Sequence, residues 1–236
     1  MRLRRAPTGA AALAFEQAGR PSDGVAWRDA RWCALDLEMT GLDPQDDEII
    51  AIGAVPIEQG RIILGECAYT LVRTSKRSKH GAVLVHKLRL ADVADAPSLD
   101  EAMDCVFGAL NGRVPVFHTA AIEAGFLERQ FARRHVRLPR PADTEVLGRR
   151  WLRHRDGSAA ADRISLGRLA DALGQPAEAP HHALGDALTT AKAFLALASL
   201  LDAVTPQTVG SLTARGTAAD AGPGGRPAGA RRFGPG

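Results

Sequence analysis

Two carboxylates stand one residue apart in a stretch that otherwise has the composition of a buried strand. The stretch is CALDLEMTGLDP, residues 33–44, and the acids are Asp36 and Glu38. Successive side chains of a strand alternate between its faces, so both acids point to one face, opposite Leu35 and Leu37. Like charges side by side repel, and burying them unpaired is costly, so the pair requires open water or a cation. Two such acids without further signals are typical of a solvated surface strand, so their interpretation depends on the rest of the chain.

The composition is that of an ordinary soluble globular protein. Of 236 residues, 45% are hydrophobic and 24% are charged, which predicts one domain with a sizeable core. The total formal charge is +3. Residues 1–30 carry +2 and residues 205–236 carry +3, so the body between them carries −2. The overall basicity is therefore weak evidence for a nucleic-acid-binding groove. Three basic clusters of the body are candidates either for phosphate contacts or for solvated helix ends and loops: residues 74–80, 133–140 and 149–155.

Cysteine usage and hydropathy favour a cytoplasmic protein. Three cysteines lie far apart without C-x-x-C spacing, which argues against a disulfide framework and a zinc site; they are Cys33, Cys67 and Cys105. The basic start of the chain resembles a signal sequence, but Glu16 interrupts its apolar run and no small-residue cleavage site stands out. The apolar stretch 193–204 is shorter than the roughly 20 residues of a membrane span and contains Asp202. We therefore expect no membrane association.

The chain divides into three segments by composition. Residues 1–30 are expected to form a loosely ordered lead with one short Ala-rich helix. Residues 31–203 are expected to form the folded domain. Residues 204–236 are rich in Gly, Pro and Arg and have little apolar surface, so we expect a disordered tail.

Strand-like runs come first in the body and then alternate with helical segments. The runs are RWCALDLEM (31–39), EIIAIGAVPIE (48–58), RIILGECAYTLVR (61–73) and VPVFH (114–118), of which the first three predict an antiparallel meander. A capping box from Ser98 to Glu101 predicts a helix at about 98–110, and further helices are expected at about 120–134 and 184–203. Two more helices are expected to begin after an extended segment near 143 and after Ser165. This order predicts an α/β fold in which helices cover both faces of a mixed sheet.

Further ionisable residues interrupt the apolar pattern later in the chain. Glu123 lies on the helix after the strand at 114–118, and Asp186 lies in the first turns of the last helix, behind His181 and His182. Together with Asp36 and Glu38, these acids can converge on a divalent cation. Oxygen ligands without cysteine suit Mg²⁺ or Mn²⁺. Two such ions about 4 Å apart stabilise the attacking and the leaving oxygen of a phosphoryl displacement. A histidine beside them can accept a proton from the attacking water. This combination predicts a phosphodiester hydrolase.

Each of these residues also has a structural explanation when it is taken singly. Asp186 suits the positive N-terminus of a helix, and Asp143 suits a helix cap. His118 suits a core histidine whose hydrogen bonds are satisfied.

Three motifs in this order resemble the DEDDh 3′–5′ exonucleases, the family of the epsilon proofreading subunit of bacterial DNA polymerase III. The motifs are LDLEMTGLDPQDDEIIAIGAV, FHTAAIEAGFL and HHALGDA, and the likeness spans about residues 31–203. The segments VHKLRLADVADAPSLDEAM and ADTEVL also look like the family's connecting segments. The resemblance implies a ribonuclease H-like fold with a mixed five-stranded sheet between helices.

The resemblance also implies roles for named residues. The two metal ions would be held by Asp36, Glu38, Asp186 and Glu123, and His181 would be the general base. The terminal nucleotide would be cradled by backbone and apolar contacts of Met39, Thr40 and Leu42, with His118 nearby. The products implied are nucleoside 5′-monophosphates.

The sequence departs from the family pattern at several positions. Thr119 replaces the usual Asn, Glu123 the usual Asp and Met39 the usual Thr. Glutamate is one methylene longer than aspartate, so the carboxylate of Glu123 would reach a metal ion or its bound water at a different angle. A misplacement of 1 Å costs roughly 100-fold in rate, so we expect activity to be reduced or redirected. Helix spacing favours His182 as the base, but the family pattern selects His181, and Pro180 favours a loop there.

Several functions remain open from the sequence. We expect hydrolysis of single-stranded DNA from its 3′ end, with an exoribonuclease of the same family as the nearest alternative. A third possibility is a weakened module that binds nucleic acid or a DNA polymerase subunit without cutting.

Overall fold

The structure is a computed structural model in which residues 5–157, 163–178 and 180–214 are described. Its centre is a mixed sheet with the strand order β3-β2-β1-β5-β6, to which β4 adds by pairing with β2. The strands are β1 (Trp32–Met39), β2 (Ile49–Glu58), β3 (Arg61–Ile62), β4 (Ala68–Leu71), β5 (Val114–Phe117) and β6 (Ala142–Asp143). β2 runs antiparallel to β1, β3 and β4, whereas β5 runs parallel to β1 and β6. The expected mixed sheet and its initial antiparallel strands are confirmed.

The described residues contain six strands where five were expected. The run 61–73 is interrupted by a 3-10 turn at Leu64–Glu66, which separates β3 from β4. Both segments pair with β2 at different places, so one expected strand becomes two short ones.

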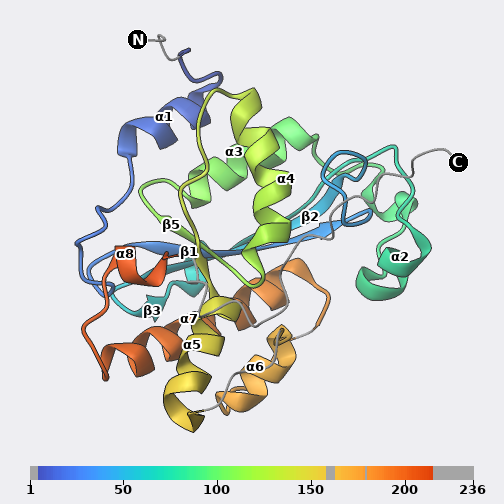
Figure 1. Ribbon diagram of the computed structural model, residues 1–236. Coiled ribbons are helices and arrows are strands. Elements are labelled where there is room, and N and C mark those ends of the chain that lie inside the picture. The colour runs from blue at the N-terminus through green and yellow to red at the C-terminus, as the bar shows by residue number, and fades with distance from the viewer. Residues whose placement is uncertain (1–4, 158–162, 179, 215–236) are drawn as a thin grey trace, which may run out of the picture.

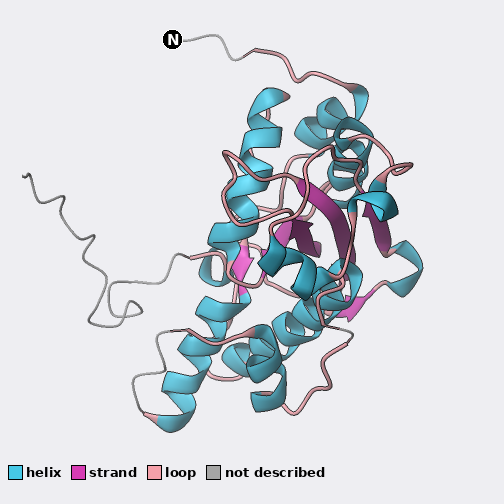
Figure 2. Ribbon diagram, turned by 90° about the vertical axis from the view of Figure 1, so that its right-hand side faces the viewer, coloured by secondary structure: helices cyan, strands magenta, loops and turns pink. Residues whose placement is uncertain are grey.

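Helices cover both faces of the sheet (Figure 1). One face carries α1 (Ala10–Ala18), α3 (Leu99–Ala109) and α4 (Ala120–Arg133), and the other carries α5 (Thr144–Asp156), α6 (Leu166–Ala172), α7 (Ala183–Asp202) and α8 (Val209–Leu212). The short helix α2 (His80–His86) stands apart at one end of the sheet, which Figure 2 turns toward the viewer. Helix α2 was not predicted from the sequence.

The alternation of β1 decides which core meets which side chain. Cys33, Leu35 and Leu37 belong to the core beneath α3 and α4, whereas Trp32 and Ala34 belong to the core beneath α7. Asp36 and Glu38 continue the second series by the period of two. The two carboxylates therefore lie on the face of the sheet that α7 covers.

The N-terminal lead is part of the fold rather than loosely ordered. The ring of Phe15 in α1 lies 5.5 Å from those of both Phe107 and Phe131. Trp27 is 1% exposed and meets Phe194 edge to face. The expected Ala-rich helix is present, but two large aromatic side chains bind the lead to both cores, because burying each stabilises the contact.

The start of the expected tail is also folded. Ala26 forms an isolated antiparallel bridge with Thr208, and Val209 and Leu212 are buried. Thr208 and Ser211 form a capping box at α8. The folded unit thus extends past residue 203, and the remainder of the predicted tail, residues 215–236, lies outside the described residues.

Helix α7 is the one helix, within the described ranges, that is long and apolar enough to cross a membrane by length and composition. It is longer than the apolar stretch 193–204 considered from the sequence. Half of the apolar window is buried inside the protein, including Phe194 and Leu197. The same composition is found in core helices, and α7 packs in that way against the sheet and α5.

Candidate active site

The end of β1 and the start of α7 bring distant carboxylates together. Asp36 is paired with Gly53 of β2, and a side chain on Gly53 would collide with the backbone of Ala183 and Leu184. The first turn of α7 therefore rests directly on the sheet because position 53 is glycine. Asp186 follows in that turn, so it reaches the face of β1 that carries Asp36.

Asp36, Glu38 and Asp186 form the only group of at least three potential metal ligands found among the described residues. One carboxylate oxygen of each lies within 4.8 Å of those of the other two. An all-oxygen donor set of this size suits a hard cation such as Mg²⁺ or Mn²⁺. The sequence-based expectation that these three side chains converge is therefore met in space.

Burial and mutual repulsion disfavour ionisation of these acids. Burial, and then the charges of Glu123 and Asp186, raise the pKa of Asp36 well above its usual range. Burial, followed by Asp186, raises the pKa of Glu38 to about 7. The pKa of Asp186 is raised by burial, although the backbone amide of His181 opposes the shift. A divalent cation would relieve this repulsion, so the donor set fits such an ion.

Glu123 enters the same charge cluster from α4. It is 7% exposed, and its Oε2 is buried without a hydrogen-bond partner in the described structure. Burial raises its pKa, and the nearby charge of Asp143 adds to the shift. Glu123 acts electrostatically on Asp36, but it is not in the group of three whose oxygens are mutually close. A buried carboxylate oxygen without a partner is a further feature that fits a cation or its water shell.

Asp143 caps the helix that carries Glu123. Its carboxylate accepts hydrogen bonds from the backbone amides of Thr119 (3.2 Å), Ala120 (2.9 Å) and Glu145 (2.9 Å). Thr119 adopts a left-handed conformation with φ of 61°. The structure thus gives Asp143 the capping role that the sequence suggested, at the starts of α4 and α5.

The two adjacent histidines differ in their surroundings. His181 is exposed, has φ of 61°, and donates its backbone N–H to Asp186 Oδ2 at 2.8 Å. The ring of His182 stacks on Tyr69, with centroids 4.6 Å apart and planes at 21°. Helix α7 begins only at Ala183, so both histidines precede it, as Pro180 indicated. Within the described part of the chain, the His181 ring makes no hydrogen bond, whereas the His182 ring is held by the stack.

His118 makes its hydrogen bonds to residues outside the group of three carboxylates. Its Nδ1 is 2.9 Å from Thr144 Oγ1 and its Nε2 is 3.0 Å from the carbonyl oxygen of Ile164. Burial lowers its pKa, against the charge of Asp143. Both ring nitrogens are engaged by the protein, so the structure favours the satisfied core histidine over the predicted nucleotide contact.

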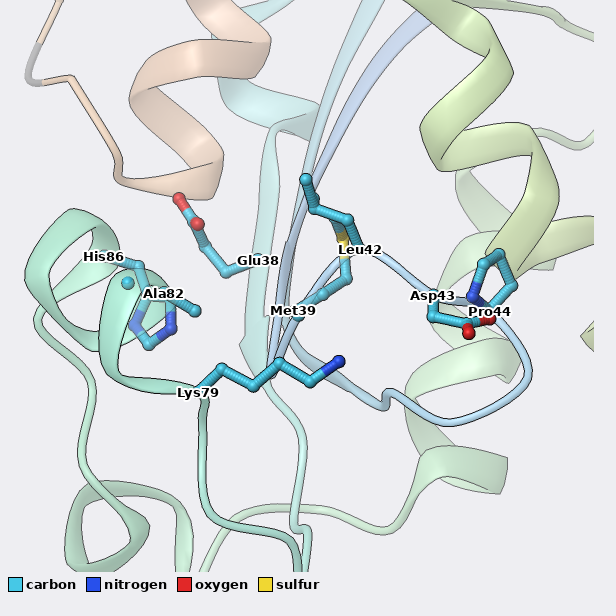
Figure 3. Close-up of a pocket in the computed structure, with 10 residues that line it drawn as sticks. Glu38, Met39, Leu42, Asp43, Pro44, Lys79, Ala82 and His86 are labelled. Carbon is cyan, nitrogen blue, oxygen red and sulfur yellow. The ribbon is translucent and has the colours of Figure 1, made fainter. Parts of the chain in front are cut away.

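A cleft of about 780 Å³ opens beside Glu38 (Figure 3). In Figure 3 Glu38 points toward the start of α7, with His86 and Ala82 of α2 on one side and Leu42 and Pro44 on the other. The lining residues are Glu38, Met39, Gly41, Leu42, Asp43, Pro44, Lys79, Gly81, Ala82 and His86. Leu42 is 70% exposed, an unusual exposure for a large apolar side chain.

Thr40 does not line this cleft, although the sequence placed it with Met39 and Leu42. It is 1% exposed, donates to Asp47 Oδ1 at 3.2 Å, and accepts from the Glu48 amide at 3.0 Å. Its carbonyl accepts from the Lys79 amide at 2.8 Å. Thr40 therefore holds the loop that forms the wall of the cleft.

The sequence reasoning did not identify His86, Lys79 and Tyr69 as parts of this region. His86 is 7% exposed, its Nδ1 accepts from the Leu88 amide at 2.9 Å, and its Nε2 is buried without a partner. Burial, and then the charge of His181, lower the pKa of His86. The segment VHKLRL, which resembles the family's connecting segment, was the available signal for His86.

The chain matches the model of an exonuclease family, RNase T, over residues 33–194. The matched range extends from β1 into α7 and includes the three clustered carboxylates and Glu123. The chain belongs to the RNase T exonuclease family. The family resemblance drawn from the three motifs is therefore confirmed.

Curated relatives of this exonuclease-family chain include proteins named after DNA polymerase III. A DNA polymerase III subunit epsilon-like protein of Rhodobacter capsulatus is 37% identical over 176 residues, which cover 72% of this chain and 24% of that protein. A PolC-type DNA polymerase III of Thermotoga maritima is 32% identical over 183 residues, which cover 76% of this chain and 13% of that protein. The chain thus spans about a quarter or less of these relatives.

Solved exonucleases share the fold. Exonuclease I of E. coli, in complex with a dT13 oligonucleotide, aligns with a TM-score of 0.60 and 14% identity, over 74% of this chain and 42% of that one. Exonuclease X, in complex with 5′ overhanging duplex DNA, aligns with a TM-score of 0.56 and 20% identity, over 77% and 97%. The expected fold class, a ribonuclease H-like sheet flanked by helices, is confirmed.

Proposed function

We propose that this exonuclease is of the DEDDh type, removes nucleotides from the 3′ end of single-stranded DNA, and releases nucleoside 5′-monophosphates. The observation that carries the proposal is the convergence of Asp36, Glu38 and Asp186 within 4.8 Å, beside a cleft large enough for a nucleotide. Asp36, Glu38, Asp186 and Glu123 would hold two divalent cations, Mg²⁺ or Mn²⁺. Bound there, the ions would supply Lewis-acid stabilisation of the charge that develops on phosphate.

His181 would act as the general base in this proposal. Its ring makes no hydrogen bond within the described residues, and its backbone N–H is anchored on the carboxylate of Asp186. An imidazole held beside the carboxylate cluster can accept the proton that an attacking water loses. The stacked ring of His182 is less available for this role.

Met39 and Leu42 would contact the terminal nucleotide through their apolar surfaces in the cleft. An exposed leucine at the mouth of such a cleft can pack against a base. Thr40 and His118 would act indirectly, by holding the 40–48 loop and the end of β5 in place.

The relatives support DNA as the substrate and a polymerase as a partner. One is named epsilon-like and another PolC-type, and the two structural neighbours were solved with DNA. We infer from these names an enzyme of DNA metabolism that associates with a DNA polymerase subunit.

Oligonucleotide digestion tests the proposed function. With Mg²⁺, 5′-labelled single-stranded DNA should give a ladder that shortens from the 3′ end, and nucleoside 5′-monophosphates should accumulate. Asp36→Asn should lower the rate by more than about 100-fold, since it removes a cation ligand. Parallel digestion of an RNA of the same sequence separates the exodeoxyribonuclease from the exoribonuclease.

A module that binds without cutting is the second candidate, because Glu123 stands where the family usually has Asp. It would be supported if the wild-type protein bound the oligonucleotide but released no mononucleotide with either Mg²⁺ or Mn²⁺. Restored cleavage in Glu123→Asp would then identify the longer side chain as the cause.

A further inference from the structure

A second, smaller pocket lies behind the loop that walls the cleft. Its volume is about 170 Å³, and its walls come from the loop after Pro44, the starts of β2 and α3, the segment after β4, and α4. Pro44 lines both this pocket and the cleft beside Glu38. The two cavities therefore adjoin at Pro44, in the loop that Figure 3 shows running from Leu42 to Pro44 beside a helix.

Basic side chains dominate the second pocket. It is lined by four cations and two acids, namely Arg73, Lys76, Arg129 and Arg133 with Asp47 and Glu48. Both acids already have partners inside the protein. Lys79 Nζ lies 2.6 Å from Asp47 Oδ2, and the hydroxyl of Thr74 donates to Glu48. The pocket therefore keeps an excess of positive charge.

Two of the four cations are used by the loop, and two are not. Arg129 donates to the carbonyl oxygens of Pro44 (2.7 Å) and Gln45 (3.3 Å), and Lys76 donates to that of Asp46. Within the ranges that the structure describes, the guanidinium groups of Arg73 and Arg133 donate no hydrogen bond. Both residues are exposed, so they stand at the mouth of the pocket.

A buried amide without a partner lines the pocket as well. Gln130 is 8% exposed, and its Oε1 is buried with no hydrogen-bond partner in the described structure. Buried polar groups in folded proteins are almost always hydrogen-bonded, so an unpartnered one inside a pocket indicates a missing ligand or water. A turn of the amide about its last bond would present its NH₂ group, a donor, to an oxyanion.

We propose that this pocket binds a backbone phosphate of the nucleic-acid strand whose 3′ end lies in the cleft. Guanidinium groups present planar pairs of donors that match phosphate oxygens, and the excess positive charge of the pocket favours a phosphate group over a neutral base. A strand that leaves the cleft across the shared wall at Pro44 reaches the mouth formed by Arg73 and Arg133. The proposal rests on the function proposed above, and it adds a contact that fixes the strand beyond the nucleotide being removed.

The test uses Arg73→Gln and Arg133→Gln, because neither residue holds the loop. The matched control is Arg61→Gln, which removes one exposed positive charge on β3, at the end of β2 remote from the pocket. Affinity for a labelled single-stranded 12-mer is measured by fluorescence anisotropy with EDTA present. Each pocket variant should weaken binding about three- to tenfold and reduce the slope of log K against log salt by about 0.7, whereas Arg61→Gln should change neither.

Turnover with Mg²⁺ separates this proposal from the proposed function. The pocket variants should raise KM for the 12-mer but not for a dinucleotide, which is too short to reach the pocket. Equal effects on both substrates, or effects no larger than those of Arg61→Gln, would overturn the proposal. A wild-type protein that cuts neither substrate would refute the exonuclease, while the anisotropy still reports on the pocket.

Inorganic phosphate distinguishes a strand phosphate from a free one. If the variants lost inhibition by millimolar phosphate while binding the 12-mer like the wild type, the pocket would hold free phosphate and the strand contact would be refuted. The strand contact is supported if phosphate competes with the 12-mer in the wild type but not in the variants, and if the variants also bind the 12-mer more weakly.

Discussion

Single residues of the carboxylate cluster are under electrostatic strain that a cation relieves. Burial, with Asp186 beside it, brings the pKa of Glu38 to about 7, so without an ion this side chain is partly protonated at neutral pH. Glu123 adds a fourth carboxylate with a buried, unpartnered oxygen. Four acids that lose hydration beside one another raise each other's pKa, which disfavours such a cluster in a core without a cation.

His181→Ala should abolish nucleotide release but keep metal binding. The substitution removes the ring, which is not in the group of three potential metal ligands, and the backbone N–H at position 181 would still reach Asp186. We expect a rate loss of about 100- to 10,000-fold for removal of a general base. The measurements are Mg²⁺-dependent digestion and calorimetric titration with Mn²⁺. The control is His182→Ala, which loses the stack on Tyr69. Full activity in His181→Ala with loss in His182→Ala would reverse the assignment.

The sequence predicts the placement of residues that a local pattern determines, but not of those whose hydrogen-bond partners are remote in the chain. The D-x-E spacing is enough to put Asp36 and Glu38 on one face. His118 could not be placed, because its ring bonds to Ile164, 46 positions away. Thr40 turns away from the cleft because Asp47 and Glu48, on the far side of a loop, bond to its hydroxyl.

At the scale of elements, the approach of α7 to the sheet sets the geometry of the site. Gly53 lies between Asp36 on β1 and Tyr69 on β4, and the first turn of α7 rests on it. The helix carries Asp186, and the segment before it carries both histidines. A change at this contact therefore moves Asp186 and the two histidines together.

Gly53→Ala should push α7 away from β1, because a Cβ there overlaps the Ala183 carbonyl. We expect destabilisation of about 1–3 kcal/mol, as for overpacking of a core, and at least about a tenfold loss of Mn²⁺ affinity. Denaturant unfolding and metal titration measure the two effects. The matched control is Gly108→Ala in α3, where a Cβ meets nothing within 4 Å and helix propensity favours alanine. Wild-type metal affinity in Gly53→Ala would contradict the positioning role.

Elements with strong local signals were predictable, and those without them were not. Ser98 and Glu101 form the capping box that opens α3, as their spacing predicted. Helix α2 has seven residues and Lys79 at its N-cap, which makes no side-chain capping bond. No side-chain cap or long periodicity marks that helix, so the sequence predicts neither the helix nor the wall of the cleft that it forms.

At the scale of the whole molecule, the ends of the described chain close the fold. Trp27 from the lead and Val209 from the expected tail both enter the core beneath α7. The composition predicts loosely ordered terminal segments, because Gly, Ala and Pro are frequent there and large apolar residues are few. Single aromatic side chains outweigh average composition, since each buries a large apolar area.

The carboxylate cluster should make the stability of the metal-free protein depend on pH. Asp36, Glu38 and Asp186 all have pKa values that are raised in the folded state, so between about pH 4.5 and 7 these three groups bind more protons in the folded than in the unfolded chain. The stability that they contribute is therefore fully present below the ordinary carboxyl pKa and is lost as pH rises through this window. Denaturant unfolding with EDTA at a series of pH values measures the slope.

Divalent cation should offset this loss above pH 7. A metal concentration of 100 times Kd adds about 2.7 kcal/mol to the free energy of unfolding. Asp36→Asn should flatten the pH slope, whereas Asp104→Asn, an exposed acid on α3, should keep it. A pH slope that is the same in the wild type and in Asp36→Asn would contradict the charge cluster.

The central claim is that Asp36, Glu38 and Asp186 form a divalent-cation site, and anomalous scattering from crystals soaked in Mn²⁺ tests it most directly. We expect an anomalous peak among the three carboxylates, about 2 Å from an oxygen of Asp36, that is lost or strongly reduced in Asp36→Asn. No peak among these side chains, or a peak that is unchanged in the variant, would contradict the account.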